Sequence, residues 1–473
     1  MSIIAKLLAH ADSSPEKIAV YEKETPMTYA QLARDIKYAT FSLKQNKLHA
    51  GDCVLVQASN SYAFICVYFA VHYLGAVVVN MATDVNDSYK QFVINKIQPS
   101  LCIEDCAIFI QDFTCIGEPR ECVMYNNHYA DLMFTSGTTG EPKGVALTHT
   151  QLVAATEHII EQVGNTSDDV ELLLMPLSHS FGMGRMRTTL YAGGTLVVGY
   201  PLQRLKGMFK AFEKHNITGF GLVPSAWAFI TQMSKNLITK YASQLNYIEF
   251  GSAYLSPEDK TQLTQWFPNT HIVMHYGLTE VSRAIFTHFH TDSHDAVGHV
   301  SRGADFAIFK ENGERAEPGE VGEITFKAPW MISEYYQNSD LTSDSFIEGY
   351  FRTGDLGKYE GEYLYLTGRL KETINVGGKK VSPRQVEDAL NQCEFVRESV
   401  CIPLADKDMG EVVQAFIVLE GDAVSEFEQV VEQLQSIVAQ SLPVHMRPQK
   451  YQLMVSLPKT SSGKVQRLQL ALM

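Results

Sequence analysis

The stretch TSGTTGEPKG, residues 135–144, is the part of the sequence from which the rest is best interpreted. It lies between two apolar runs, DLMF (131–134) and VALT (145–148), that are typical of buried strands. Its ten positions hold three glycines, which bring backbone N–H groups close to an anion, and four hydroxyl side chains. Lys143 adds a cation. The stretch predicts a phosphate-binding loop without Walker spacing, and a polar turn rich in Ser, Thr and Gly is the alternative.

Around this loop, apolar runs alternate with helical patterns from about residue 50 to residue 270. Short apolar strands separated by amphipathic helices indicate layered α/β architecture with largely parallel sheets. Ser256-Pro257 predicts a helix start, with the serine as cap and the proline in the first turn. The expected strands are CVLVQA (53–58), AVVVN (76–80), ELLLM (171–175), TLVV (195–198), TGFGLV (218–223) and YIEF (247–250).

The pattern changes past residue 295. Asn312-Gly313 favours a tight turn within 306–328 and predicts a hairpin, so residues 295–366 indicate a small β-rich subdomain. A helix begins at Ser382 with capping-box spacing, and about the last hundred residues then run strand (VCIPL), strand (VVQAFIVL), long helix (424–441), strand (QLMVS) and final loop. The expected fold is α/β: a large N-terminal lobe of layered α/β subdomains, a small β-rich subdomain, and an α+β C-terminal domain.

The composition is that of a globular protein. The chain has 473 residues, of which 45% are hydrophobic and 19% charged, enough for several cores. The formal net charge is −14. Because a negative surface repels nucleic acid and anionic lipid, neither is an expected partner. A phosphate site would need local positive charge against this background.

The run AFICVYFAVHYLGAVVVNMA (63–82) imitates a membrane span, but His72 and Gly75 interrupt it. We expect a buried helix of about a dozen residues and then a core strand, with a span as the alternative. The eight cysteines include no CxxC pair, and four fall at irregular spacing between residues 102 and 122, near His128. We expect reduced thiols in a cytoplasmic protein, with a metal site as the alternative.

Seven further motifs accompany the loop in a fixed order. They are PLSHSFGMG (176–184), GSAYL (251–255), HYGLTE (275–280), GEI (322–324), YFRTGDLG (350–357), GRLKETINVGGKKVSPRQVE (368–387) and PKTSSGKVQR (458–467). Together they resemble the signature motifs of the adenylate-forming superfamily, from about Thr28 to Arg467. That superfamily comprises acyl- and aryl-CoA synthetases, firefly luciferase and the adenylation domains of nonribosomal peptide synthetases. The resemblance implies an enzyme that uses ATP to make an acyl-AMP with release of pyrophosphate.

The resemblance also implies roles for single residues. Lys464 would bridge the substrate carboxylate and the α-phosphate, and a solvated terminal lysine is the alternative. Glu280 would hold Mg²⁺ against the triphosphate. Thr279 would donate to the α-phosphate, and His179 completes the expected catalytic set. The implied nucleotide-binding residues are Thr135, Ser136, Gly137, Thr138, Thr139, Gly140, Lys143, Ser252, Ala253, Tyr254, Tyr276, Gly277, Asp355 and Arg369.

Three of the nucleotide-binding residues have a competing interpretation. Tyr276 is expected to stack on adenine, and a core aromatic is the alternative. Asp355 is expected to accept from both ribose hydroxyls, and Arg369 to reach the ribose or a phosphate. For these two, a salt-bridged turn is the alternative.

Lys371 lies at the position that resembles the hinge of the family. This implies an N-terminal AMP-binding domain over residues 1–370 and a mobile C-terminal domain over residues 371–473. One pose would present Lys464 for adenylation, and the other would present Gly377 and Gly378 for thiol attack. Glycines suit a narrow pantetheine that passes close to the backbone.

The expected acyl site is formed by His179, Phe181, Val223, Gly251 and Gly277. No aspartate stands in PLSHSFGMG to pair with an ammonium group, so an α-amino acid is disfavoured. An aryl acid and a short- or medium-chain aliphatic acid both fit an adaptable apolar pocket.

The thiol acceptor is expected to be CoA, because PKTSSGK is closer to acyl- and aryl-CoA synthetases than to peptide-synthetase domains. A phosphopantetheine thiol on an acyl or peptidyl carrier protein is the alternative. A relative that binds nucleotide or acyl ligand without turnover is a second alternative. The oligomeric state stays open, a homodimer included, because positions 100–130 are short for the family.

Overall fold

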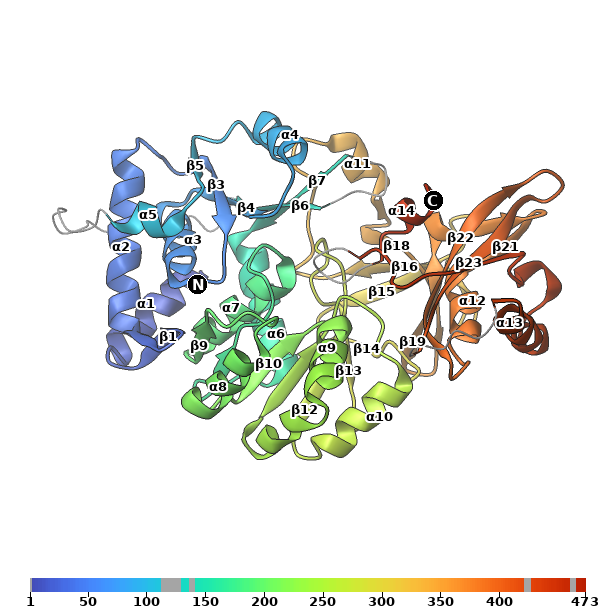
Figure 1. The fold of residues 1–473 in the computed structure, drawn as a ribbon. Coiled ribbons are helices and arrows are strands. Elements are labelled where there is room, and N and C mark those ends of the chain that lie inside the picture. Colours follow the sequence, from blue (N-terminus) through green and yellow to red (C-terminus); the bar gives the residue numbers. More distant parts are fainter. Residues whose placement is uncertain (1, 112–128, 136–140, 421–426, 460–464) are drawn as a thin grey trace. The chain divides into compact units, whose positions relative to one another are not determined.

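The structure is a computed structural model and describes residues 2–111, 129–135, 141–420, 427–459 and 465–473 (Figure 1). The chain divides into two compact units. The large unit comprises residues 1–305 and 326–351, and the small unit comprises residues 306–325 and 352–473.

The large unit contains a nine-stranded sheet in the order β14-β13-β12-β11-β10-β8-β9-β1-β2. The strands from β12 to β1 in this order are parallel, and antiparallel strands close both edges. This is the arrangement that alternating strands and helices predict. The bounds are β1 Ile18–Glu22, β2 Thr25–Thr28, β8 Val170–Leu172, β9 Thr195–Val198, β10 Gly219–Leu222, β11 Tyr247–Phe250, β12 His271–Tyr276, β13 Ile285–His288 and β14 His299–Val300.

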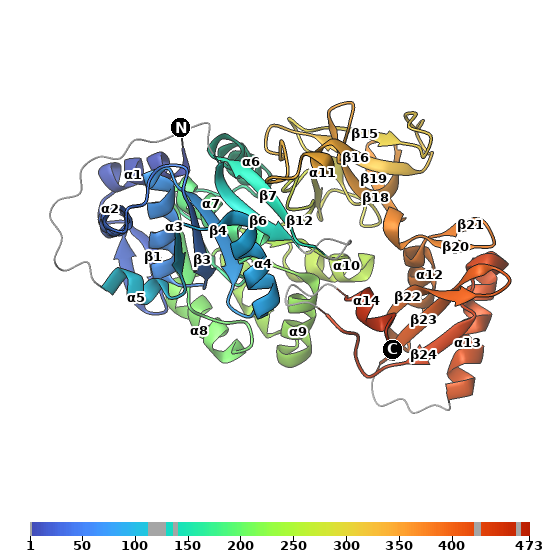
Figure 2. The same cartoon turned by 90° about the horizontal axis from the view of Figure 1, so that it is seen from above.

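A second sheet of the large unit carries the strands that flank the predicted phosphate loop. Its order is β5-β3-β4-β6-β7, and only the β6–β7 pair is antiparallel (Figures 1 and 2). The bounds are β3 Cys53–Ala58, β4 Val77–Ala82, β5 Leu101–Ile103, β6 Tyr129–Thr135 and β7 Lys143–Thr148. The helices of this unit other than α3 and α7 are α1 Ile3–Ser13, α2 Tyr29–Gln45, α4 Asp87–Ile97, α5 Cys106–Gln111, α6 His149–Val163, α8 Leu205–His215, α9 Pro224–Ser234, α10 Pro257–Trp266 and α11 Ser339–Asp344.

Helix α3, Tyr62–Leu74, is buried over its whole length and is followed by β4. Gly75 ends the helix with a φ of +79°. The run that imitates a membrane span is therefore a core helix and a strand, as predicted. Across the described ranges, no helix is both long and apolar enough to cross a membrane.

Helix α7, Ser180–Ala192, is also buried on all sides, from Phe181 to Leu190. A helix with no exposed face is usually apolar all round, but α7 carries Arg185 and Arg187. Since a buried charge requires a partner, the two arginines pair with carboxylates of different sheets, Glu171 and Glu249 for Arg185 and Asp131 for Arg187. These pairs fix α7 between the two sheets.

Residues 305–369 form a five-stranded sheet in the order β15-β16-β18-β17, with β19 paired to β18. The hairpin predicted within 306–328 is confirmed: the Lys310 N–H donates to the Glu314 carbonyl, and Gly313 has a φ of +83°. The bounds are β15 Asp305–Phe309, β16 Gly322–Lys327, β17 Phe346–Ile347, β18 Tyr350–Glu360 and β19 Tyr363–Arg369.

The C-terminal part of the small unit is an α+β module, as predicted. Its sheet has the order β21-β20-β23-β22, with β24 paired to β23. The bounds are β20 Ile374–Val376, β21 Lys379–Val381, α12 Pro383–Leu390, β22 Val396–Asp406, β23 Gly410–Leu419, α13 Phe427–Ser441, β24 Lys450–Leu453 and α14 Arg467–Leu470. The predicted fold class is thus confirmed.

Two predicted helix starts have different outcomes. Helix α10 begins as predicted, since the Ser256 side chain accepts from the Asp259 N–H and Pro257 lies in the first turn. Ser382 precedes α12, as predicted, but its side chain makes no capping hydrogen bond, so the predicted capping box is wrong. The Ser382 hydroxyl donates instead to the Thr367 carbonyl at 2.5 Å, a partner on another strand.

Candidate active site

The predicted phosphate loop joins the two strands of the β6–β7 hairpin. Thr135 and Lys143 are direct partners in its register, so the loop's two ends lie opposite each other. Its last residue, Gly144, is packed closely: an added Cβ would lie 3.2 Å from Phe134 and from Tyr336. The Tyr336 N–H also donates to the Gly144 carbonyl at 2.8 Å. Residues 136–140, which include Ser136, Gly137, Thr138, Thr139 and Gly140, lie outside the described residues.

Tyr335 connects this hairpin to Glu280. Its backbone pairs with Val145 in an antiparallel bridge, and its hydroxyl donates to Glu280 Oε1 at 2.8 Å. The Lys143 ammonium lies 5.4 Å from the centre of the Tyr335 ring. Burial and the nearby carboxylate raise the pKa of Tyr335, so its hydroxyl stays a donor. A cation and a carboxylate from distant motifs therefore meet on one tyrosine.

Glu280 is suited to hold a divalent cation against a phosphate. The carboxylate is nearly buried, and the Ile332 N–H fixes its backbone carbonyl at 2.8 Å. Among the described residues, no group of three or more His, Cys, Asp or Glu could enclose a metal by itself. One carboxylate is enough for Mg²⁺ when phosphate oxygens and water supply its other ligands, so the residues fit this ion.

The HYGLTE motif forms the end of β12 and the turn that follows it. Tyr276 is half-buried, with its ring centre 6.1 Å from that of Phe326. An added Cβ at Gly277 would lie 1.7 Å from the Ser282 carbonyl oxygen, so only glycine fits this turn. Thr279 is half-buried beside Glu280.

The GSAYL motif follows β11 as an open loop. Ser252 is exposed and has a φ of +72°, Ala253 is half-buried, and Tyr254 is exposed. These side chains have surface to offer a nucleotide, and their predicted role stays a prediction.

The segment before α7 is held by two asparagine side chains that sequence reasoning missed. The Asn60 amide donates to the Met175 carbonyl at 3.0 Å and accepts from the Leu177 N–H at 2.9 Å. The Asn80 amide donates to the Leu177 carbonyl. These contacts position His179, which precedes α7 and is half-buried.

The predicted acyl-site residues lie where β10 and β11 end beside β12. Val223 and Gly251 follow directly after the adjacent parallel strands β10 and β11. The ring of Phe181 stands edge-on to His275, with 4.7 Å between the ring centres. The structure thus brings Phe181, Val223 and Gly251 to one region and adds His275, which the sequence analysis did not propose for it.

A buried charge network lies beneath this region. Arg185 bonds Glu171 at 2.7 Å and Glu249 at 2.9 Å, and Arg283 bonds Glu249 at 2.5 Å. His275 Nδ1 lies 2.6 Å from the same Glu249 carboxylate. Burial alone would raise the pKa of Glu249, but Arg283, Arg185 and His275 hold it below its usual range. The network was missed, because α7 also carries Ser180, Thr188 and Thr189 and its sequence does not predict that Arg185 is buried.

A second buried network ties α7 to the strand that enters the phosphate loop. Asp131 of β6 accepts from His72 at 2.9 Å, from Arg187 at 2.9 Å and from Tyr68 at 3.0 Å. Burial alone would raise the pKa of Asp131, but His72 and Arg187 hold it below its usual range. This carboxylate therefore stays ionised and fixes the position of β6 against α7.

In the small unit, Asp355 and Arg369 are cross-strand partners and form an ion pair at 2.7 Å. Asp355 is 2% exposed, whereas the Arg369 side chain is 45% exposed. The structure therefore contains the ion pair between Asp355 and Arg369 that was the alternative to a ribose-binding role. A ribose could reach Asp355 only if Arg369 moved aside or shared the contact.

Gly377 and Gly378 form the turn between β20 and β21, with φ values of +56° and +83°. Two consecutive residues at positive φ are the requirement of a two-residue hairpin turn, which explains both glycines without a ligand. Lys371 lies in the short 3₁₀ helix Leu370–Glu372 and is exposed. Lys464 lies outside the described residues.

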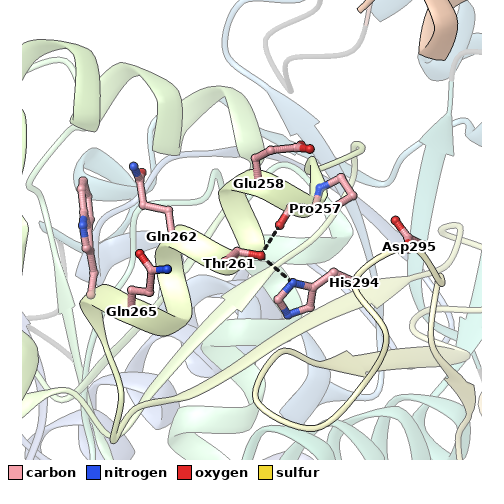
Figure 3. Close-up of a pocket in the computed structure, with 8 residues that line it drawn as sticks. Pro257, Glu258, Thr261, Gln262, Gln265, His294 and Asp295 are labelled. Atoms are coloured by element: carbon pink, nitrogen blue, oxygen red, sulfur yellow. Dashed lines mark hydrogen bonds between the residues drawn. The ribbon is translucent and has the colours of Figure 1, made fainter. Parts of the chain in front are cut away.

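A polar groove of about 410 Å³ runs along α10, the helix that follows the GSAYL motif (Figure 3). Its only bonds drawn in Figure 3 join the Thr261 hydroxyl to the Pro257 carbonyl and to His294. The lining residues are Pro257, Glu258, Thr261, Gln262, Gln265, Trp266, His294 and Asp295, none of which was predicted as a site residue. We assign it no role in the chemistry.

The cysteine cluster gives no sign of a metal centre in the part of the chain that the structure describes. Cys102 is exposed and Cys106 is buried, and both are free thiols. Cys115, Cys122 and His128 lie outside the described residues.

Two models of protein families match the chain. The one described as AMP-binding enzyme matches residues 7–336. The one described as AMP-binding enzyme C-terminal domain matches residues 385–464.

Individual relatives agree with these matches. The chain is 27% identical to 4-coumarate–CoA ligase-like 9 of Arabidopsis thaliana, over 94% of this chain and 84% of the relative. It is 25% identical to a D-alanine–D-alanyl carrier protein ligase of Bacillus licheniformis, over 99% of both chains. The crystal structure of ATP-bound MatB from Rhodopseudomonas palustris has a TM-score of 0.90 at 23% identity and covers 99% of this chain and 98% of its own. At this identity the structural likeness shows the fold alone.

Proposed function

Because the chain belongs to the AMP-binding enzyme family, within the adenylate-forming superfamily, we propose that it activates a carboxylic acid with ATP and passes the acyl group to a thiol. A carboxylate does not acylate a thiol at neutral pH, because oxide is a poor leaving group. Attack of a carboxylate oxygen on the α-phosphorus breaks the bond to pyrophosphate and leaves an acyl-AMP. The sulfur then attacks the acyl carbon, and AMP leaves with the bonding electrons.

The observation that carries this proposal is that Tyr335 contacts both Glu280 and β7, the strand that follows the phosphate loop. It brings Lys143 and a nearly buried carboxylate to one place. A carboxylate there would repel a triphosphate unless a hard cation lay between them. The arrangement therefore favours a phosphate ligand that arrives with Mg²⁺.

The proposed roles in adenylation follow from charge. The loop 135–144 and Lys143 would bind the phosphates, and Glu280 would bind Mg²⁺, which neutralises phosphate charge when it is bound. Thr279 would donate to the α-phosphate. Lys464 would supply the cation that holds the carboxylate against the α-phosphorus, because catalysis of this step is chiefly positioning and electrostatic stabilisation.

The small unit is proposed to supply the remaining parts. The ribose hydroxyls would share Asp355 with Arg369. Lys371 would act as the hinge between domains 1–370 and 371–473, and the Gly377-Gly378 turn would border the path of the thiol. These assignments rest on the motif resemblance and stay proposals.

CoA is the proposed acceptor, and the acid is an aryl or a short- or medium-chain acyl acid. The CoA ligase of Arabidopsis supports this acceptor, and the carrier protein ligase of Bacillus supports a phosphopantetheine thiol as the alternative. All described cysteines are free thiols, which suits the cytoplasm, and we propose that location.

The test is a panel of aryl, aliphatic and α-amino acids, each incubated with the purified protein, ATP, Mg²⁺ and either CoA or a holo-carrier protein. Mass spectrometry of the products identifies acyl-CoA or acyl-carrier. The proposal expects acyl-CoA, AMP and pyrophosphate in equal amounts for at least one aryl or aliphatic acid. Acyl-carrier without acyl-CoA would favour the alternative acceptor, and no product from any acid would favour a relative that only binds.

A further inference from the structure

His275 lies at the carboxyl ends of parallel strands, the place where ligands of such sheets bind. In the β11–β12 register Phe250 pairs with Met274, so the next residues, Gly251 and His275, are neighbours. The Gly251 N–H donates to the Leu222 carbonyl at 3.3 Å, which keeps β10 alongside. His275 therefore borders the residues to which the acyl group is assigned.

Glu249 fixes the tautomer of His275. Its Oε1 atom lies 2.6 Å from Nδ1, and so short a contact between a carboxylate and a ring nitrogen requires a proton between them. Burial, and next the charge of Arg283, lowers the pKa of His275 to about 4, so the ring is neutral at pH 7. Arg283 Nε lies 3.2 Å from Nδ1 but is closer to the same Glu249 oxygen, at 2.5 Å. Nδ1 is thus the donor and Nε2 carries the lone pair.

The lone pair of Nε2 has no protein donor within the described ranges. The side chain of His275 is 8% exposed, and Gly251 borders the ring. An added Cβ at Gly251 would lie 2.2 Å from Nε2, so glycine is what leaves this edge of the ring uncovered. Phe181 stands against the ring at 88°, an apolar wall beside a single acceptor.

The fixed charges around His275 balance. Arg185 and Arg283 are matched by Glu171 and Glu249, and the four side chains bond one another. A second carboxylate or an ammonium group on the acid would add a buried charge without a counterion, which is costly. A neutral donor adds none.

We propose that His275 determines specificity by accepting a hydrogen bond from a hydroxyl group on the acid, and that the substrates are hydroxy acids. This rests on the proposed function and on the expected acyl site, which includes Gly251 and Gly277 on either side of His275. β12 ends at Tyr276, so Gly277 lies just past the strand, two residues after His275. Glu249 acts through His275 as a positioning residue.

The test compares matched acids that differ by one hydroxyl. The pairs are 4-hydroxybenzoate with benzoate and 5-hydroxypentanoate with pentanoate, and acid-dependent ATP–pyrophosphate exchange gives kcat/KM for each. The hydroxylated member is expected to be favoured about 10- to 100-fold in at least one pair, because the other member leaves the buried acceptor unsatisfied. Equal or inverted preference in both pairs would overturn the proposal.

Two variants separate recognition from structure. His275→Asn keeps a donor near the Nδ1 position for Glu249 but removes the nitrogen that faces Gly251. His275→Gln places an amide near the Nε2 position. The preference should fall to about onefold in the Asn variant and be retained in part by the Gln variant, with unfolding midpoints close to wild type. Full preference in the Asn variant would contradict the proposal.

The experiments distinguish failure of the proposed adenylation activity from failure of the role proposed for His275. If no acid supports exchange, the adenylation activity is wrong, and calorimetric binding of the same acid pairs to wild type and His275→Asn still decides the inference. Tighter binding of the hydroxylated member that is lost in the Asn variant would support it. Equal binding within each pair would overturn it.

Discussion

The part of the nucleotide region around Lys143 and Glu280 and the region assigned to the acyl group both belong to the large unit but are built differently. The nucleotide region consists of short continuous motifs, with Lys143 and Glu280 joined through Tyr335. The acyl region is held by single side chains that bond one another in the core: charged ones from β8, α7 and β11, and the neutral His275 from β12. We therefore expect substitutions in the nucleotide region to leave the core intact, whereas the charge network of the acyl region is itself part of the core. The comparison therefore predicts activity losses in one region and stability losses in the other.

The largest expected effect is on stability, in the acyl region. Arg185→Ala leaves Glu171 and Glu249 as buried carboxylates with fewer counterions, so the free energy of unfolding of the large unit should fall by about 3–5 kcal/mol. Urea unfolding followed by tryptophan fluorescence reports this unit, because all three tryptophans, Trp227, Trp266 and Trp330, lie in it.

The matched control for that variant is Arg34→Ala, which removes an exposed ion pair with Asp35. It should cost less than about 1 kcal/mol. An Arg185→Ala protein that is as stable as the control would show that the network does not hold the acyl region together.

The next effect is on activity, in the nucleotide region. Glu280→Gln removes the charge that would bind Mg²⁺ but keeps an oxygen for the Tyr335 hydroxyl. Acid-dependent pyrophosphate exchange should fall about 100-fold while the unfolding midpoint stays near wild type. Glu161→Gln, at an exposed position of α6, should change neither quantity. Unchanged exchange in Glu280→Gln would remove this carboxylate from the nucleotide site.

The smallest effect is a pH dependence that belongs to the acyl region. His158 Nε2 donates to the Arg283 carbonyl at 2.9 Å, and burial lowers the pKa of His158 from 6.5 to about 4. The unfolded state therefore binds a proton first as the pH falls, and stability is lost between about pH 6.5 and pH 4. From pH 7 to pH 5 the loss should be about 2 kcal/mol.

His158→Phe removes this titration. The variant should lose less stability than wild type between pH 7 and pH 5, measured by urea unfolding at each pH. Identical losses in the two proteins would show that His158 does not contribute to the acid sensitivity.

The difference between short continuous motifs and contacts among distant residues also explains which features the sequence could predict. The strands on both sides of TSGTTGEPKG, the helix α3 with β4, and the start of α10 at Ser256 depend on residues close in the sequence, and all were predicted. The capping box at Ser382 was wrong because the hydroxyl is directed to the Thr367 carbonyl, fifteen residues away, and its oxygen does not accept from the first turn of α12. Local patterns fail where a tertiary partner competes.

Within the candidate site, the residues that were missed are those whose partners are far away. Asn60, Asn80 and Glu249 are ordinary polar residues until the fold places Leu177 and His275 beside them. No spacing rule relates residues on separate strands before the topology is known. Arg185 and Arg187 of α7 were missed as well, because their need for a partner follows only once the structure shows that the helix is buried.

The most direct test of the account is exchange of labelled pyrophosphate into ATP, measured with each acid of the panel in wild type and in Lys464→Ala. A second assay supplies the corresponding acyl-AMP with CoA. The account predicts acid-dependent exchange in wild type, at least a 100-fold loss in the variant, and thioester formation from acyl-AMP that is largely retained in both. Absence of exchange with every acid, or equal loss of both half-reactions in Lys464→Ala, would contradict it.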